Sequence, residues 1–127
     1  MNTKINNVVK ISTSLDGKFF RYWLEFLKPF HHLADREINV LACFLKHRYE
    51  LSKVIKDVNI LDKVTMSDDV KKKVIEECNI TLPHFRVILG KLRKNKVIEN
   101  DRINFKFIPN IEEDKGQFQL LLFFELK

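Results

Sequence analysis

The chain has 127 residues, of which 45% are hydrophobic and 31% charged, with three glycines and three prolines. This length suits one domain with a buried core, and the composition excludes a disordered or linker-like chain. The formal net charge of +6 favours a polyanionic partner, with nucleic acid first and an anionic membrane surface second. No apolar run is long enough to span a bilayer and the first residues lack the apolar core of a signal peptide, so we expect no membrane-spanning segment and a cytoplasmic location. Of the two kinds of polyanion we therefore expect nucleic acid, and not a membrane, as the partner.

The N-terminal third begins with residues 5–11, which are rich in β-branched side chains and predict a short strand. Residues 19–27 place aromatic and aliphatic side chains at helical spacing, so we expect a helix that Pro29 ends. Residues 1–32 therefore form an aromatic-rich N-terminal extension. We expect it to dock on the main body or on another subunit, because an exposed apolar patch of this size favours association.

The main body, residues 33–127, is predicted to open with a helix that Asp35 caps and that runs to about Tyr49. Residues 50–66 contain apolar side chains without one clean period. They predict a loop with a short helical turn.

A pair of short helices follows, and each has recognisable end signals. Ser67 is the expected cap of the first helix, and Asn79 its end in the left-handed conformation. Thr81 is the expected cap of the second helix, with Pro83 in the first turn and Asn95 at the end. The apolar residues expected to form the buried stripe of the second helix are Phe85, Ile88, Leu89 and Leu92.

The C-terminal third predicts a long β-hairpin. Its first strand begins at Val97, with a bend near residues 101–104, and residues 112–116 form a polar, acidic tip. Residues 118–126 carry the strongest strand signal of the chain. The apolar run at residues 120–124 is expected in the core of the sheet, with a subunit interface as the alternative.

Three segments resemble the winged helix-turn-helix family of DNA-binding domains. Residues 33–41 resemble its opening helix, and residues 74–98 are similar to its helix-turn-helix core, with Asn79 where the family usually has glycine. Residues 103–109 look like the segment entering the wing of small phage- and plasmid-type regulators and replication proteins. The resemblance implies an α+β winged helix-turn-helix, with a three-helix core plus a C-terminal β-hairpin, preceded by the N-terminal extension.

The resemblance and the charge pattern together indicate double-stranded DNA as the partner. From His84 to Lys96 there are five Lys/Arg and no acid. On the second helix the lysines and arginines are placed to neutralise phosphates, and His84 or Arg86 is placed to reach base edges. The candidate DNA-binding residues are His84, Arg86, Lys91, Arg93, Lys94 and, on the first helix, Lys72. A merely solvated basic face is the alternative interpretation.

Gly90 lies on the same outer side of the second helix, where glycine costs about 1 kcal/mol relative to alanine. A smooth spot facing DNA or another helix would explain this glycine, and a neutral accident is the alternative. The acidic wing tip disfavours a contact between the wing and DNA.

Signals for catalysis or a metal are missing from the sequence. Cys43 and Cys78 form no CxxC pair, so we expect free thiols in a reducing compartment and no zinc site. The four histidines have no metal-ligand spacing with acids or cysteines, and His31 and His32, which follow Pro29, are expected in a surface turn. We therefore expect that the protein is not an enzyme and that it has no catalytic residues, no metal and no cofactor.

The expected function is that of a transcriptional regulator or replication accessory protein of a phage or mobile element, located in the host cytoplasm if phage-encoded. The alternative is a structural or interaction protein, such as a component of a phage particle or a transcription complex. The aromatic residues 19–23 and the acidic wing favour this alternative. It implies a homodimer or a protein partner that contacts the N-terminal extension.

Overall fold

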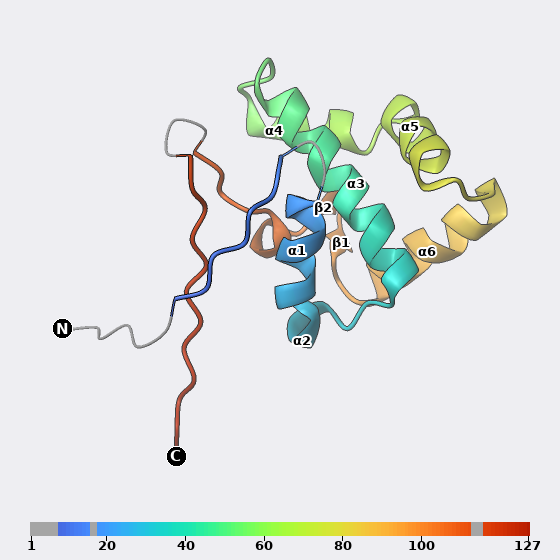
Figure 1. Ribbon diagram of the computed structural model, residues 1–127. Coiled ribbons are helices and arrows are strands. Elements are labelled where there is room, and N and C mark those ends of the chain that lie inside the picture. Colours follow the sequence, from blue (N-terminus) through green and yellow to red (C-terminus); the bar gives the residue numbers. More distant parts are fainter. Residues whose placement is uncertain (1–7, 16–17, 113–115) are drawn as a thin grey trace.

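The computed structural model describes residues 8–15, 18–112 and 116–127, and within them it is an α+β arrangement of six helices and one two-stranded antiparallel sheet (Figure 1). The helices are α1 (Phe19–Phe26), α2 (Lys28–His31), α3 (Asp35–Ser52), α4 (Val58–Thr65), α5 (Asp68–Cys78) and α6 (Leu82–Lys94). The strands β1 (Ile98–Glu99) and β2 (Arg102–Ile103) are followed by a 3₁₀ helix, η1 (Phe105–Phe107). The α+β class expected from the sequence is confirmed.

Helix α3 is the central element, and α1, α4, α5 and α6 all pack against it. Its buried face includes Ile38, Leu41 and Phe44, which are fully enclosed. The rings of Phe44 and Phe85 lie 6.1 Å apart and join α3 to α6. One hydrophobic core thus extends from α1 to η1.

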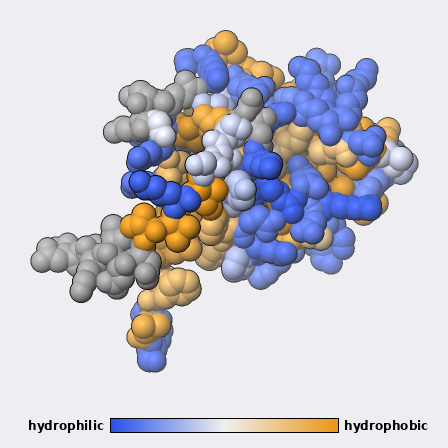
Figure 2. Space-filling model, in the orientation of Figure 1, coloured by the Kyte–Doolittle hydropathy of each residue, from blue (hydrophilic) through white to orange (hydrophobic). Residues whose placement is uncertain are grey.

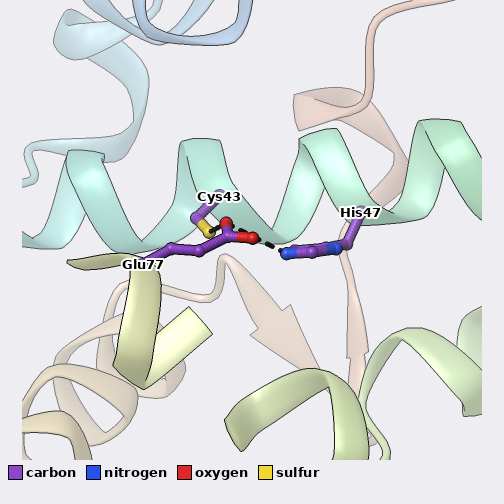
Figure 3. A group of neighbouring side chains, drawn as sticks. All are labelled: Cys43, His47 and Glu77. Atoms are coloured by element: carbon purple, nitrogen blue, oxygen red, sulfur yellow. Dashed lines mark hydrogen bonds and ion pairs between the residues drawn. The ribbon is translucent and has the colours of Figure 1, made fainter. Parts of the chain in front are cut away.

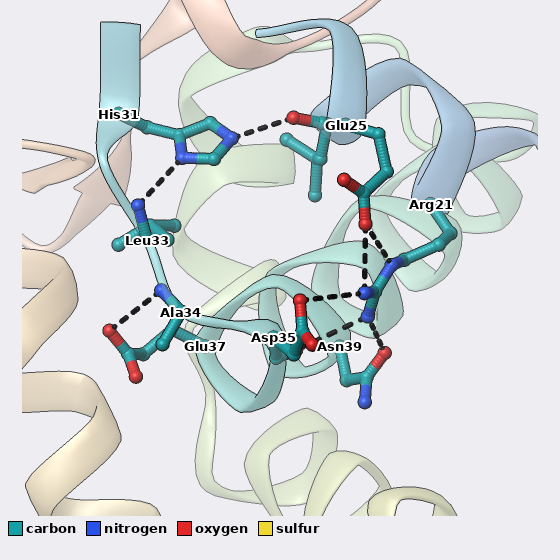
Figure 4. A network of polar contacts seen from close by, with 9 residues as sticks. Arg21, Glu25, His31, Leu33, Ala34, Asp35, Glu37 and Asn39 are labelled. Carbon is teal, nitrogen blue, oxygen red and sulfur yellow. Dashed lines mark hydrogen bonds and ion pairs between the residues drawn. The ribbon is translucent and has the colours of Figure 1, made fainter. Parts of the chain in front are cut away.

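Helix α1 forms where the aromatic spacing predicted it, and its apolar side buries Phe20, Trp23 and Leu24 in the same core as α3. On its polar side, Arg21 pairs with Glu25 and reaches across to α3, where it bonds to Asp35 and Asn39 (Figure 4). Burial on one side and this network on the other fix α1 against the start of α3.

The segment between α1 and α3 differs from the prediction in two respects. Helix α1 ends at Phe26, and Pro29 lies in the first turn of α2, where a missing backbone N–H costs little. His31 is fully buried, whereas its position after Pro29 predicts a surface turn. Its Nε2 lies 2.7 Å from the carbonyl oxygen of Leu24, and its Nδ1 accepts a 3.0 Å bond from Leu33 N–H (Figure 4). Only His32 of the pair is exposed.

Helices α3 and α4 are both longer than predicted. The N-cap of α3 is Ala34 and not Asp35, whose side chain is instead engaged by Arg21. Residues 58–65 form a full helix of two turns, where a loop with a short helical turn was expected, and Asp57 accepts a bond from the backbone N–H of Ile60 at the N-cap. An ion pair of 3.1 Å between Arg48 and Asp62 holds α4 on α3.

The α5–α6 pair follows the predicted end signals closely. Ser67 and Thr81 accept bonds from the backbone N–H groups of Val70 and His84, which caps both helices. Asn79 takes the left-handed conformation, with φ of 52°, and reverses the chain between the helices.

The β-hairpin is much shorter than predicted, and it lies earlier in the chain. Ile98 pairs with Ile103, and the two-residue turn at Asn100 and Asp101 has positive φ at both positions, as type I′ turns require. Both isoleucines are buried in the shared core, where β1 packs against α6 and β2 packs against α4. The predicted long hairpin, with its tip at residues 112–116, is therefore wrong; residues 113–115 of that tip lie outside the described residues.

The terminal segments also differ from the prediction. Residues 8–11 and 118–126 have no regular secondary structure, and residues 5–7 lie outside the described residues. Phe118 packs edge-on against Phe19 and Trp23, with ring centroids 5.1 and 5.4 Å apart. Beyond it, the apolar run expected in the core is exposed, because this segment forms no strand and neither of the described strands pairs with it. Figure 2 shows hydrophobic side chains at the lower left, where Figure 1 places this C-terminal segment.

Candidate nucleic-acid interface

The candidate site is the outer side of α6, which lies at the right of Figure 1, away from the terminal segments. Thr81 fixes the first turn of this helix. The predicted apolar stripe holds the helix against the core, with Phe85, Ile88, Leu89 and Leu92 all buried. Because side chains repeat every 3.6 residues, burying this stripe turns the other side chains of the helix outward. The buried face expected from the sequence is confirmed.

Four of the predicted cations lie exposed on α6: Arg86, Lys91, Arg93 and Lys94. Their side chains form no hydrogen bond or ion pair with any described residue. Elsewhere in the described part of the chain, Arg21, Lys46 and Arg48 each contact a carboxylate. Since α6 carries no acid of its own, its outer side keeps an uncompensated positive charge.

The remaining predicted residues occupy different settings. His84 is only half-exposed and lies in the first turn of α6, and Lys72 is exposed on α5. The structure thus gathers five of the six candidates onto one helix, with the sixth on the helix before it.

The middle of the outer side of α6 carries no long polar side chain, because Val87 and Gly90 occupy it. Val87 is 60% exposed, and a Cβ built on Gly90 would meet nothing within 4 Å. No packing contact among the described residues therefore requires glycine at this position.

The hairpin that follows α6 is compact and carries charges of both signs. Its exposed residues are Glu99, Asn100, Asp101 and Arg102. Lys96, with φ of 59°, turns the chain from the end of α6 into β1 and is exposed beside it. The basic surface is accordingly centred on α6.

A polar cluster that the sequence analysis missed joins α3 to α5. The Glu77 carboxylate oxygen Oε2 lies 2.8 Å from Cys43 Sγ and 3.1 Å from both Lys46 Nζ and His47 Nε2 (Figure 3). Burial disfavours the charged forms of Glu77 and Lys46. For Glu77 the hydrogen bonds from Cys43 and then from Lys46 outweigh burial, and for Lys46 the bond to Glu77 and the charge of that carboxylate outweigh it. The pKa of Glu77 is therefore lowered and the pKa of Lys46 is raised.

The two thiols are neighbours in this cluster. Cys78 Sγ donates a 3.9 Å bond to the backbone carbonyl oxygen of Asn39, and the proximity of the two thiols is the main cause that raises the pKa of Cys43 and lowers the pKa of Cys78. The absence of metal-ligand spacing stated from the sequence needs correction, because Cys43 and His47 are four residues apart on one helix. That spacing was the available signal, and Glu77 is 30 residues beyond His47.

Comparisons of the chain with models of protein families, with curated proteins and with solved structures find no match. None of the helices in the described ranges is long and apolar enough to cross a membrane. The residues of α6 and their surroundings therefore carry the functional conclusion.

Proposed function

We propose that this protein binds double-stranded DNA as a winged helix-turn-helix, with α6 as the recognition helix, and acts as a phage or mobile-element regulator or replication accessory. The observation that carries the proposal is the exposed outer side of α6, whose four cations have no partner among the described residues. A helix supported by a preceding helix is the common device for entering the major groove. Helices α5 and α6, joined by three residues, fit that device.

The positions along α6 suggest a division of roles. His84, Arg86 and Val87 lie in the N-terminal half, where recognition helices contact base edges. Lys91, Arg93 and Lys94 fall in the last part of the helix and would contact phosphates, as would the exposed Lys72 of α5.

The hairpin would play a minor part. Its turn is two residues long and includes Asp101, whose charge disfavours approach to a phosphate backbone. The helix pair would therefore supply most of the contacts.

The test is a fluorescence anisotropy titration of labelled random-sequence duplex DNA at several salt concentrations. Contacts to several phosphates predict a log–log slope of about −0.9 for each phosphate neutralised. The variant Lys91→Glu/Lys94→Glu should lose at least tenfold in affinity at low salt and should show a shallower slope.

A matched control separates a located contact from a general charge effect. The variant Lys28→Glu/Lys63→Glu has the same net charge, and it alters exposed lysines on α2 and α4. It should keep most of the affinity. An equal loss of DNA affinity in both variants would show that α6 is not the binding face. Undetectable binding by the natural sequence would show that DNA is not the partner.

A second candidate function, an interaction protein such as a component of a phage particle or transcription complex, is favoured by the C-terminal segment. Leu121, Phe123, Phe124 and Leu126 are 61 to 92% exposed, and scattered exposure of single apolar residues does not account for such a run. The aromatic side chains of α1 expected at an interface are mostly buried instead, so the segment after Phe118 is the better contact surface.

Light scattering after size-exclusion chromatography tests this second candidate. The comparison is between the full chain and a chain that ends at Phe118, which keeps the packing of that ring on α1. A full chain that assembles and a truncated chain that is monomeric would support an interaction role. Equal masses at all concentrations would exclude self-association through this segment.

A further inference from the structure

A cluster of metal-ligating side chains lies between α3 and α5, apart from the outer side of α6. Cys43 and His47 project from the same side of α3, because they are one turn apart, and Glu77 meets them from the last turn of α5 (Figure 3). One potential ligand atom from each residue, namely sulfur, nitrogen or carboxylate oxygen, lies within 4.8 Å of the other two. Two helices thus bring three different donor types to one point.

The spacing of these atoms is close to that required around a single ion. Zinc binds sulfur at about 2.3 Å and nitrogen or oxygen at about 2.0–2.2 Å, so tetrahedral ligands would place sulfur and oxygen about 3.6 Å apart and nitrogen and oxygen about 3.4 Å apart. The observed distances to Glu77 Oε2 are 2.8 Å from Cys43 Sγ and 3.1 Å from His47 Nε2. A shift of the carboxylate by less than about 1 Å would admit the ion.

The cluster is accessible to an ion from solvent, and its ligands can balance the charge of a dication. His47 is buried, Cys43 is half-buried, and the side chain of Glu77 is 40% exposed, so the cluster is open on one side. Binding would replace the thiol proton of Cys43 with the metal and would leave a thiolate, a carboxylate and a neutral imidazole around a dication. Lys46, which also contacts Glu77 Oε2, would have to move aside or turn to the other carboxylate oxygen.

We propose that Cys43, His47 and Glu77 form a binding site for a divalent transition-metal ion of the zinc type, with water in the fourth position. The sulfur and imidazole donors select zinc or cobalt over magnesium or calcium, which prefer oxygen ligands alone. Three protein ligands leave one coordination position open. The ion would connect α3 to α5, and this inference stands whether or not α6 binds DNA.

Cobalt(II) is a suitable probe, because a bond to thiolate produces a charge-transfer band in the near ultraviolet and tetrahedral geometry produces intense visible bands. The full chain is reduced, freed of metal with a chelator and titrated with Co²⁺ while absorption is recorded. We expect both sets of bands to appear with one equivalent and to disappear when Zn²⁺ is added. A natural sequence that shows no charge-transfer band would overturn the proposal.

Single substitutions identify the ligands. Cys43→Ser should abolish the charge-transfer band, and His47→Gln and Glu77→Gln should each weaken Co²⁺ binding at least tenfold. Cys78→Ser is the matched control, because it removes the neighbouring thiol but leaves the three ligands in place. A band that survives in Cys43→Ser but is lost in Cys78→Ser would overturn the assignment.

Two further controls distinguish metal binding from loss of the fold. Circular dichroism of each metal-free variant should match that of the natural sequence, and His84→Gln, on α6, should bind Co²⁺ as the natural sequence does. Zn²⁺ should also raise the urea midpoint of the natural sequence and leave that of His47→Gln unchanged. An equal rise in both would show that the ion binds elsewhere and would contradict the site.

Discussion

The indole Nε1 of Trp23 donates a 2.8 Å hydrogen bond to the backbone carbonyl oxygen of Phe107, 84 residues later in the chain. The bond is buried, and it joins α1 to η1 at the point where Phe118 also packs on the indole ring. The side chain of Trp23 therefore connects the first helix, α1, to the last regular element, η1, and to the segment that follows it.

Shortening Trp23 should destabilise the protein in two steps. Trp23→Phe removes the donor and leaves a buried carbonyl without a partner, at a cost of about 1–3 kcal/mol. Trp23→Ala also opens a cavity and should cost about 3–5 kcal/mol. The measurement is urea unfolding followed by circular dichroism, since the chain has no other tryptophan to report fluorescence. Phe26→Ala, at an exposed position of the same helix, should change little; a comparable loss there would contradict the role of the bond.

Asn79 should rank between glycine and alanine in the stability it confers. Its φ of 52° favours glycine, and an alanine there should cost about 1 kcal/mol relative to asparagine. Asn95, which ends α6 with a φ of −86°, is the matched control, and Asn95→Ala should be nearly neutral. Thermal unfolding of Asn79→Gly, Asn79→Ala and Asn95→Ala decides the order. Equal losses at the two asparagines would contradict the conformational explanation.

The stability of the protein should decrease as the pH falls from 7.5 to 5.5, because of His31. Burial is the main cause that lowers the pKa of His31, and its two bonds require a neutral ring with hydrogen on Nε2. In the unfolded chain the ring takes up a proton near pH 6.5, the ordinary pKa of a histidine side chain. The contribution of His31 is therefore present above pH 6.5 and is lost below it, with a slope of at most about 1.4 kcal/mol per pH unit.

Urea unfolding across this range measures the slope. His31→Gln should flatten it, because an amide can donate to Leu24 and accept from Leu33 without titrating in this window. His32→Gln, at the exposed neighbour, should keep the slope of the natural sequence. Glu77, whose pKa is lowered, titrates below pH 4.5 and does not contribute in this window. A His31→Gln slope equal to that of the natural sequence would assign the pH dependence to other groups.

Gly90→Ala should have opposite effects on two properties, raising the stability of the protein and lowering its affinity for DNA. The added methyl group meets nothing within 4 Å, so the helix should gain about 0.5–1 kcal/mol. If α6 enters a DNA groove with Gly90 close to the backbone, then Gly90→Ala should weaken DNA binding and Gly90→Gln should weaken it further. The checks are urea unfolding and the anisotropy titration on the same samples. Unchanged affinity in both variants would place Gly90 outside the DNA contact.

The helix pair α5–α6 could be predicted from the sequence because its ends are set by local interactions. The hairpin and the setting of His31 could not, because they depend on contacts between segments far apart in the chain. Ser67, Asn79 and Thr81 act on backbone groups within a few residues, so their roles could be inferred from the sequence. The hairpin was misplaced because the apolar run at residues 120–124 suggested a buried strand, whereas no partner strand exists among the described residues. His31 was assigned to the surface because its burial depends on contacts with α1 that spacing does not reveal.

The candidate sites show the same division. Helical periodicity was sufficient to divide α6 into a buried stripe and a basic outer side. Whether those cations were already paired required the positions of the carboxylates around them, which only the structure supplies. The cluster of Cys43, His47 and Glu77 needed the packing of α5 on α3, because its third member comes from a different helix.

The two terminal segments leave the body on the side of α1, whereas α5 and α6 form the opposite side (Figure 1). A tag or linker attached at the C-terminus would therefore extend away from the outer side of α6. Immobilising the protein through that end should present α6 to the solution, so surface-based binding assays can use a C-terminal anchor without blocking the helix. The same attachment would cover the exposed apolar segment, which makes it unsuitable for measuring self-association.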